Sequence, residues 1–180
     1  IQKCTSSWIS FLDADDYWLP NKLENVVDVI NKKGTVNFIA HDELTYKNNS
    51  ELSNIKLSSY FKKNYSLSSQ LFLRNFLSTS SCTVSNALLR KYLFDPYLTS
   101  CQDYELWLSM APKIRLVYLS KILGFYDNHN KLSITNNNQI NRFKNLMIVL
   151  LRYYKYVSLS KFFLTILKHL ISFFIKWVKK

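Results

Sequence analysis

The stretch WISFLDADDYWLPNKL, residues 8–23, decides the fold class of this chain. Its apolar start predicts a short buried strand over residues 8–12, and three aspartates follow at once. A proline then marks the start of a helix near residue 20. A strand, an acidic turn and a helix indicate an open α/β sheet, in which ligands bind at the carboxyl ends of the strands. We therefore expect Asp13, Asp15 and Asp16 at a ligand site.

Two interpretations of these aspartates remain open from their spacing alone. Three carboxylates this close repel one another unless solvent, helix-terminal N–H groups or a cation offsets the charge. A bound Mn²⁺ or Mg²⁺ would do so, because both ions favour carboxylate oxygens, and Mg²⁺ usually takes one or two carboxylates plus substrate phosphates. Alternatively, the aspartates form a solvated turn in which Asp16 supports the start of the helix.

Composition limits the other kinds of site. The chain has 180 residues, 48% of them hydrophobic, which predicts one globular body with a real core. Its two glycines cannot form a Gly-rich phosphate loop or a GxGxxG fingerprint. Cys4, Cys82 and Cys101 are odd in number and widely spaced, which argues against disulfides or zinc and favours a reducing cytoplasm.

The start of the chain, IQKCTSSW, has no initiator Met and no basic segment followed by an apolar core. We therefore expect no signal peptide, and a chain that is either a fragment of a longer product or the product of a truncated gene.

Charge is distributed unevenly along the chain. The net charge is +12, yet all twelve acidic residues lie at or before Asp127, and ten Lys and Arg residues follow it. Such a basic tail predicts an anionic partner surface.

The other expected elements are read from periodicity and turn residues. We expect a helix that ends before Gly34, and His41 as a polar strand-end residue rather than a ligand. The remaining expected elements are a strand over residues 36–40, a loop or hairpin tip over 47–53, a helix over 66–77, a strand turning into a short helix over 82–89, an amphipathic helix over 103–111, and strands over 114–118 and 122–126.

A second acidic motif lies in SSCTVSNALLRKYLFDPYLTSCQDYELWL, residues 80–108. By spacing alone, Ser100 followed by Asp103 fits an ordinary helix start, in which the acid interacts favourably with the helix dipole. Cys101 is interpreted as a packed thiol rather than a nucleophile.

Both motifs together resemble family 2 glycosyltransferases, which have the GT-A fold. The order apolar strand, DADD, aromatic, Pro, Lys-Leu-Glu resembles the metal-binding segment of that family, and S-N-x-L-x-R-K, F-D and Q-D-Y-E-L-W-L resemble its acceptor side. The resemblance covers residues 6–133. It implies an α/β class, partial GT-A (Rossmann-like) domain with Mn²⁺ or Mg²⁺ at Asp13, Asp15 and Asp16. It also implies inverting transfer of a sugar from a nucleotide-diphosphate donor to a cell-envelope glycan or a lipid-linked acceptor.

The resemblance also implies roles for single residues. Asp103 matches the family's catalytic base, although Gln102 stands where Glu is usual, and Tyr104 and Trp107 are expected to contact the acceptor. The segment around His129 resembles Y-R-x-H-x-x-S, which implies that His129 approaches the diphosphate, while Asp127 replaces the Arg.

Members of the family normally begin with a nucleotide-binding βαβ half that contains a V-S-V-I-I-P-x-Y-N type segment. No counterpart precedes Ile1. We therefore expect residues 1–135 to be the metal-and-acceptor portion of the GT-A domain. The alternative is a non-catalytic membrane-surface module that derives from a truncated glycosyltransferase.

The tail, residues 136–180, predicts two basic helices, over 139–156 and from 159 to the end. In the second, Lys161, Lys168 and Lys176 fall on one stripe with Thr165, opposite a broad apolar face. That face includes Phe173, Phe174 and Trp177.

The pattern of this second helix predicts peripheral attachment to the anionic inner face of the cell membrane. A membrane span would place Lys168 and His169 near the bilayer centre, which is costly, and a core or oligomer helix remains the other alternative. The apolar face disfavours nucleic acid as the partner.

Overall fold

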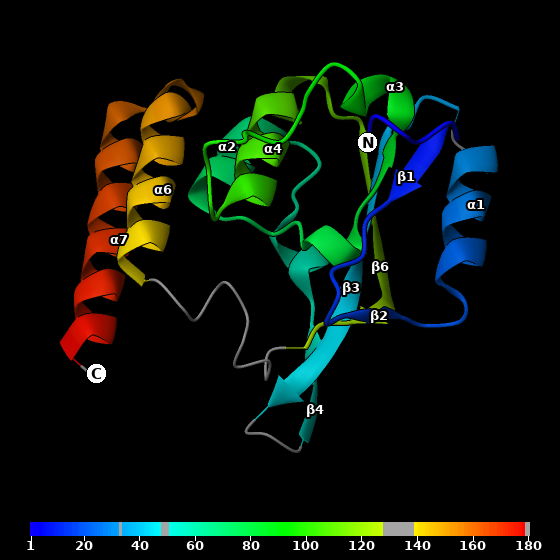
Figure 1. Cartoon of the computed structure of the whole chain (residues 1–180), viewed down its shortest axis with the longest axis horizontal. Helices are drawn as coiled ribbons and strands as arrows, with labels where there is room; N and C mark the ends of the chain where they lie inside the picture. The colour runs from blue at the N-terminus through cyan, green and yellow to red at the C-terminus, as the bar shows by residue number, and fades with distance from the viewer. Residues whose placement is uncertain (33, 48–50, 128–138, 179–180) are drawn as a thin grey trace.

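Strands from both halves of the chain form one mixed sheet at the centre of the molecule (Figure 1). The computed structural model describes residues 1–32, 34–47, 51–127 and 139–178. The strands within these residues are β1 (Trp8–Ser10), β2 (Tyr17–Trp18), β3 (Phe38–Lys47), β4 (Glu51–Ile55), β5 (Thr83–Ser85) and β6 (Leu116–Phe125). Their order is β1-β5-β3-β6-β2, with β4 paired to β3. The β3–β6 pair is parallel, and the other pairs are antiparallel.

The two central strands are longer than the sequence predicts. The expectation of separate strands at 114–118 and 122–126 is wrong, because β6 runs unbroken along β3, with an irregular register opposite residues 41–43. The expectation that His41 ends its strand is also wrong, since β4 and β6 flank β3 and extend it to Lys47. The loop or hairpin tip expected over residues 47–53 is shorter than expected, because β3 runs to Lys47 and pairs with β4 from Glu51 on; residues 48–50 lie outside the described residues.

The helices largely follow the expected spans. They are α1 (Lys22–Lys32), α2 (Leu67–Leu73), α3 (Asn86–Leu89), α4 (Gln102–Met110), α6 (Gln139–Arg152) and α7 (Leu159–Val178), with short 3₁₀ turns at Leu57–Tyr60, Thr79–Ser81, Ala111–Lys113 and Tyr154–Tyr156. The expected helix over 66–77 ends early, because the chain is extended from Arg74, and Phe76 and Leu77 enter the core without helical turns. The strand that turns into a short helix is confirmed as β5 and α3.

Alternation along β3 separates two apolar layers. Phe38 and Ala40 face the large core beneath α2 and α4, whereas Ile39 faces the smaller cluster beneath α1. Figure 1 shows α1 on one side of the sheet and α2 with α4 on the other. The face of α1 against the sheet carries Val26 and Val29. Ile30 packs against the same cluster, whereas Leu23 and Val27, which follow the same helical spacing, are about half exposed.

Two further expectations about burial are wrong. The strand β1 is only half-buried, and Leu12 beyond it is 47% exposed, because β1 is an edge strand paired only with β5. The helix α4 is not amphipathic in its surroundings, since buried residues occur all round it. Trp107 of α4 has no exposed surface and meets the rings of Phe11 and Phe38 edge-on at 5.7 and 5.1 Å.

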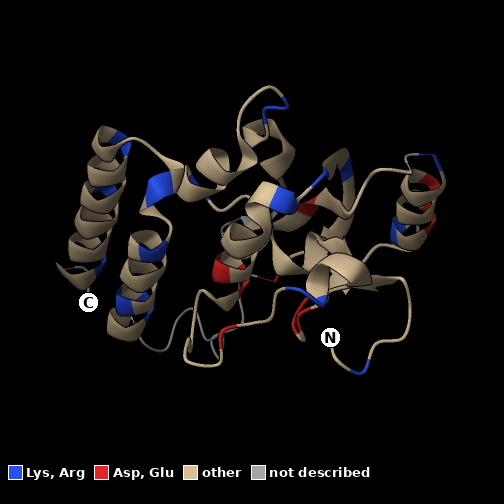
Figure 2. Ribbon diagram, turned by 90° about the horizontal axis from the view of Figure 1, so that it is seen from above, with Lys and Arg blue, Asp and Glu red and all other residues tan. Residues whose placement is uncertain are grey.

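The two tail helices form an antiparallel pair beside the sheet domain, with α7 outermost (Figures 1 and 2). Val149 and Leu150 of α6 are fully buried in the large core, so this helix packs onto the domain. Phe173 of α7 stacks on Phe143 of α6 with ring centroids 4.5 Å apart. Within residues 1–32, 34–47, 51–127 and 139–178, no helix is long and apolar enough to cross a membrane. The expected boundary between residues 135 and 136 lies outside the described residues.

Candidate active site

The turn of residues 13–16, called the acidic turn below, is held in place by Ser80. The backbone N–H of Asp13 donates a hydrogen bond of 2.9 Å to the Ser80 hydroxyl. The Ser80 carbonyl oxygen accepts from the Trp18 indole at 3.0 Å and from the Lys22 ammonium at 2.9 Å. Ser80 and Lys22 are both buried, so these bonds are shielded from water. One serine therefore ties both flanks of the acidic turn to the segment before β5.

Asp16 lies inward and connects the acidic turn to the end of β6. Its Oδ1 accepts a hydrogen bond of 2.9 Å from the backbone N–H of Asp127, while its Oδ2 is buried without a partner. Burial raises the pKa of Asp16, and the repulsion of Asp15 and Asp127 adds to this, although hydrogen bonds from Ser80 and Asp127 act in the opposite direction. Asp16 thus links the acidic turn to the end of β6 through Oδ1, and its Oδ2 remains available to a ligand.

The second acidic motif is positioned by an unusual helix start. Cys101, at the N-cap of α4, has a φ of 59°, the only positive φ of a non-glycine residue in the described part of the chain. Such a conformation is strained for a residue with a Cβ and is often found at functional sites. It turns the chain so that Asp103 enters the first turn of α4, where its Oδ2 accepts a hydrogen bond of 3.4 Å from Asn75.

Burial raises the pKa of Asp103 above its ordinary value. Backbone N–H groups at the start of α4, the Asn75 amide and the charge of Arg142 oppose that rise. A carboxylate held at a helix start can accept a proton from a neighbouring hydroxyl group.

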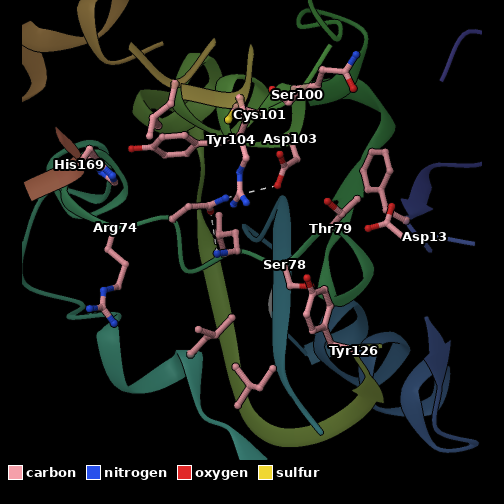
Figure 3. Close-up of a pocket in the computed structure, with 18 of the residues that line it drawn as sticks. Asp13, Arg74, Ser78, Thr79, Ser100, Cys101, Asp103, Tyr104, Tyr126 and His169 are labelled. Atoms are coloured by element: carbon pink, nitrogen blue, oxygen red, sulfur yellow. Dashed lines mark hydrogen bonds between the residues drawn. The ribbon is translucent and has the colours of Figure 1, made fainter. Parts of the chain in front are cut away.

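One cavity of about 1690 Å³ receives both acidic motifs. Asp13, Asp15 and Asp103 line it, and Figure 3 shows the carboxylates of Asp13 and Asp103 directed into it from different elements. Burial raises the pKa of Asp13 to about 6, and repulsion from Asp16, Asp103 and Asp15 contributes to the rise. Asp103 thus influences Asp13 electrostatically although ninety positions separate them in the sequence.

Several site residues were missed in the sequence. Glu43 lines the cavity from β3 and is 1% exposed, and no well-formed hydrogen bond reaches its carboxylate oxygens from the described part of the chain. The only local signal for it is the polar triplet at residues 41–43, which follows an apolar run. Ser80 lies in a Ser-rich segment that predicts only a loop, so nothing in the sequence marks it. Lys22 is fully buried, although lysine is a residue type that is mostly exposed.

The expected acceptor residues fall in different places. Tyr104 lines the cavity, and its hydroxyl donates to the carbonyl oxygens of Leu71 and Phe72 at 3.0 and 2.9 Å. Trp107 lies in the core behind the cavity wall and does not line it. His129 lies outside the described residues. Trp107 was expected to contact the acceptor, but it has no exposed surface with which to do so.

The thiol of Cys101 agrees with its interpretation as a packed group rather than a nucleophile. Cys4, Cys82 and Cys101 are all free. Burial raises the pKa of the Cys101 thiol, and the nearby Asp103 adds to this. A thiol that ionises less readily is a poor nucleophile, although it lies beside the expected base.

The donor atoms around the acidic turn fit a hard divalent cation. They are carboxylate oxygens, one of them on Asp16 is buried without a partner, and a cation would relieve the repulsion that raises the pKa of Asp13. Within the described ranges, no three His, Cys, Asp or Glu side chains gather closely enough to form a metal site by themselves. A cation here would take its other ligands from substrate phosphate and water.

The tail residues divide between the cavity and the outside. Lys161, Lys168 and Lys176 are exposed, and the last two also line the cavity. Phe174 and Trp177 are more than half exposed, whereas Phe173 turns inward onto α6. The single apolar face expected for this helix is therefore split between an inner and an outer face.

Comparison with known proteins identifies the family. Residues 1–98, more than half of the chain, match the model of glycosyl transferase family 2. A Rickettsia bellii protein described as an uncharacterized glycosyltransferase is 30% identical over 129 residues, which is 68% of this chain and 18% of the relative. Proteins with the same description from Rickettsia conorii and Rickettsia felis are 27% and 26% identical over 147 and 146 residues, each over 77% of this chain and 24% of the relative.

The chain thus spans about a fifth to a quarter of the length of these relatives. The matched residues contain the acidic turn, and the mixed sheet with helices on both faces agrees with a partial, Rossmann-like GT-A domain. The expected fold class is therefore confirmed, and the chain belongs to glycosyl transferase family 2.

Proposed function

We propose that this chain carries the metal-binding and acceptor-side machinery of an inverting glycosyltransferase. The donor is a nucleotide-diphosphate sugar, and the acceptor is a cell-envelope glycan or a lipid-linked sugar. The observation that supports the proposal best is that Asp13 and Asp103, from two distant motifs, line one cavity. Transfer needs a cation site that stabilises the charge of the leaving diphosphate and a base for the attacking hydroxyl. The cavity offers carboxylates suited to both tasks.

The acidic turn serves the donor in this proposal. Asp13 and Asp15 would hold Mn²⁺ or Mg²⁺, and Asp16 would assist directly or through water, while its Oδ1 accepts the hydrogen bond from the Asp127 N–H. The bound cation would supply charge stabilisation for the departing diphosphate. The hydrogen bonds from Asp13, Trp18 and Lys22 to Ser80 keep the turn in one geometry, so that little ordering is needed when the donor binds.

Asp103 is the general base. The acceptor hydroxyl attacks the anomeric carbon from the face opposite the diphosphate, the bond from that carbon to the phosphate oxygen breaks, and the hydroxyl proton passes to the Asp103 carboxylate. The Asn75 amide holds this carboxylate from the side, and the first turn of α4 favours its negative charge. Inversion of the anomeric configuration follows from the single displacement.

The test of the base uses the complete polypeptide that contains this chain. Asp103→Asn should lower kcat by about 10²–10⁴-fold and leave donor affinity nearly unchanged, because a base acts in the transition state. Asp28→Asn is the matched control, since Asp28 is exposed on α1, where it pairs with Lys32. Wild-type turnover in the Asp103→Asn protein would refute the assignment. A complete polypeptide without transfer activity towards any nucleotide sugar would favour the non-catalytic alternative.

The metal assignment is tested by calorimetry. Asp15→Asn should abolish Mn²⁺-dependent binding of a nucleoside diphosphate, because this neutral amide replaces a charged ligand of a hard cation. Unchanged metal dependence would contradict the assignment of Asp15.

We also propose that α7 attaches the protein to the inner face of the cell membrane, in the cytoplasm, where free cysteines are stable. The outer face of α7 is apolar, and each of its large side chains is more than half exposed. These residues are Phe163, Leu164, Leu167, Ile171, Phe174 and Ile175. The helix carries Lys161, Lys168 and Lys176 and no acidic residue, as Figure 2 shows. An apolar face beside basic side chains suits a helix that lies in the plane of an anionic surface.

Vesicle sedimentation tests this attachment. Phe163→Asp with Phe174→Asp should abolish binding to anionic vesicles at any salt concentration, because insertion of the outer face drives it. Phe173→Ala is the matched control, since Phe173 packs on Phe143 rather than outward. Retained binding by the double variant would show that the outer face has another partner, such as a second copy of the chain.

A further inference from the structure

The cavity has a basic wall opposite its acidic motifs. Three cationic side chains and one histidine, from α7 and the end of α2, line it; they are Arg74, Lys168, His169 and Lys176. Figure 3 shows Arg74 and His169 on the side of the cavity away from Asp13. The proposed metal site and base use only the acidic side, so the basic wall is left without a task.

The helix α7 contributes to two different surfaces. Lys168, His169 and Lys176 line the cavity, while Leu167, Ile171 and Phe174 lie on the outer apolar face. The lysines therefore occupy the rim between the cavity and the face that we propose meets the membrane. Burial and the neighbouring Lys168 lower the pKa of His169, so its imidazole is a neutral hydrogen-bond donor at physiological pH.

We propose that this basic wall binds the phosphate group of a lipid-linked acceptor. The proposal rests on the proposed function, because it assigns the acceptor of the same cavity. Lys168 and Lys176 contact the phosphate, His169 donates a hydrogen bond to it, and the hydrocarbon chain stays in the bilayer beneath the outer face of α7. The sugar of the acceptor then extends from the rim towards Asp103.

The placement favours the acceptor phosphate over the donor diphosphate. The carboxylates of the acidic turn suit a diphosphate that arrives with a divalent cation. The basic wall needs no cation to bind an anion, and it adjoins the apolar surface where a lipid-linked group is confined. A lipid-linked acceptor whose phosphate binds at this rim could place its sugar in the cavity while its hydrocarbon chain stays in the membrane.

The experiment measures binding to vesicles without any transfer reaction, so its failure is distinguishable from failure of the proposed catalysis. Phosphatidylcholine vesicles carry either a long-chain isoprenyl phosphate or phosphatidylglycerol at equal total charge. The wild-type chain should prefer the isoprenyl phosphate vesicles. Lys168→Gln and Lys176→Gln should each weaken that binding about fivefold, and about 25-fold together, if each lysine contributes as a cation at an anionic surface does.

Lys161→Gln is the matched control. Lys161 is exposed on α7 and does not line the cavity. It should share the general attraction to phosphatidylglycerol but retain the preference for isoprenyl phosphate. Equal binding to both vesicle types, or an equal loss of preference in all three variants, would overturn the proposal in favour of bulk anionic lipid.

A displacement experiment tests the phosphate site itself. Inorganic diphosphate without a metal should displace the protein from isoprenyl phosphate vesicles, whereas chloride at equal ionic strength should not. Weaker binding of inorganic diphosphate after Asp15→Asn, with no effect of Lys168→Gln, would place the phosphate at the acidic turn and overturn it.

Discussion

Glu43 offers a sharp test of the electrostatics beneath the acidic turn. Its carboxylate is buried at 1% exposure, and within the described residues neither oxygen has a well-formed hydrogen bond. Burial raises its pKa to about 7, repulsion from Asp16 and Asp13 adds to the rise, and the nearby Ser78 and Lys22 oppose it. Removal of this charge should therefore stabilise the protein.

The magnitude follows from the change in pKa. Glu43 titrates at 4.5 when unperturbed and at about 7 in the folded protein, and each pKa unit corresponds to about 1.4 kcal/mol. The ionised carboxylate thus lowers the free energy of unfolding by about 3 kcal/mol above pH 7. As the pH rises, the unfolded chain loses this proton first, so the stability falls between about pH 4.5 and 7 and then levels off.

Glu43→Gln keeps the shape and removes the charge. We expect the variant to be more stable than the wild type by about 2–3 kcal/mol at pH 8, and by little near pH 4.5. The upper value is reduced because the buried Lys22 loses an attractive neighbour. Urea unfolding at several pH values, in EDTA to exclude metal, measures both free energies.

Glu105→Gln is the matched control with the opposite sign. Glu105 is also buried, but its Oε1 accepts hydrogen bonds from Arg152 at 2.9 Å and Tyr153 at 2.6 Å. Its replacement should destabilise the protein by about 1–3 kcal/mol, because charge-assisted bonds are weakened. If Glu43→Gln proves destabilising at pH 8 by as much as at pH 5, the carboxylate has a stabilising partner and the reasoning from burial fails.

Substitutions at three other positions, Gly124, Cys101 and Ser80, test the geometry of the site. Gly124→Ala should destabilise by about 1–3 kcal/mol in thermal or urea unfolding, because its Cβ would lie 3.1 Å from a histidine ring, whereas Gly34→Ala, with nothing within 4 Å, should not. A loss at both glycines would point to the backbone instead. Cys101→Gly should retain activity and Cys101→Val should lose it, since only glycine accepts the φ of 59° without strain; equal activities would dismiss the strain. Ser80→Ala should lower the free energy of unfolding by about 1–3 kcal/mol and weaken Mn²⁺ binding in calorimetry, because the N–H of Asp13 loses its acceptor. Unaltered Mn²⁺ affinity would show that the hydrogen bond from Asp13 to Ser80 does not support metal binding.

The local features of this protein could be predicted from its sequence. The strand, acidic turn and helix of residues 8–32 each follow from signals within a few positions, and the structure has them as β1, the acidic turn and α1. The two tail helices follow from their 3.6-residue periodicity. Periodicity and turn residues act on neighbours in the chain, so they can be read without knowledge of the fold.

The pairing of distant segments was decided only by the tertiary structure. Strand β6 is continuous because it lies parallel to β3, some eighty positions earlier, and its own sequence suggested a break near residue 120. The meeting of Asp13 with Asp103 in one cavity and the clamp on Ser80 depend on the same kind of pairing.

Burial was likewise decided by the tertiary structure. The sequence marked an apolar face on α7, but contact with α6 turned Phe173 inward and left Phe174 outside. Other elements also cover the faces on which Lys22, Glu43 and Trp107 lie, so these side chains are shielded from solvent. A side chain's chemistry is fixed by its residue type, whereas its charge state and its access to a ligand depend on neighbours that only the folded chain brings together.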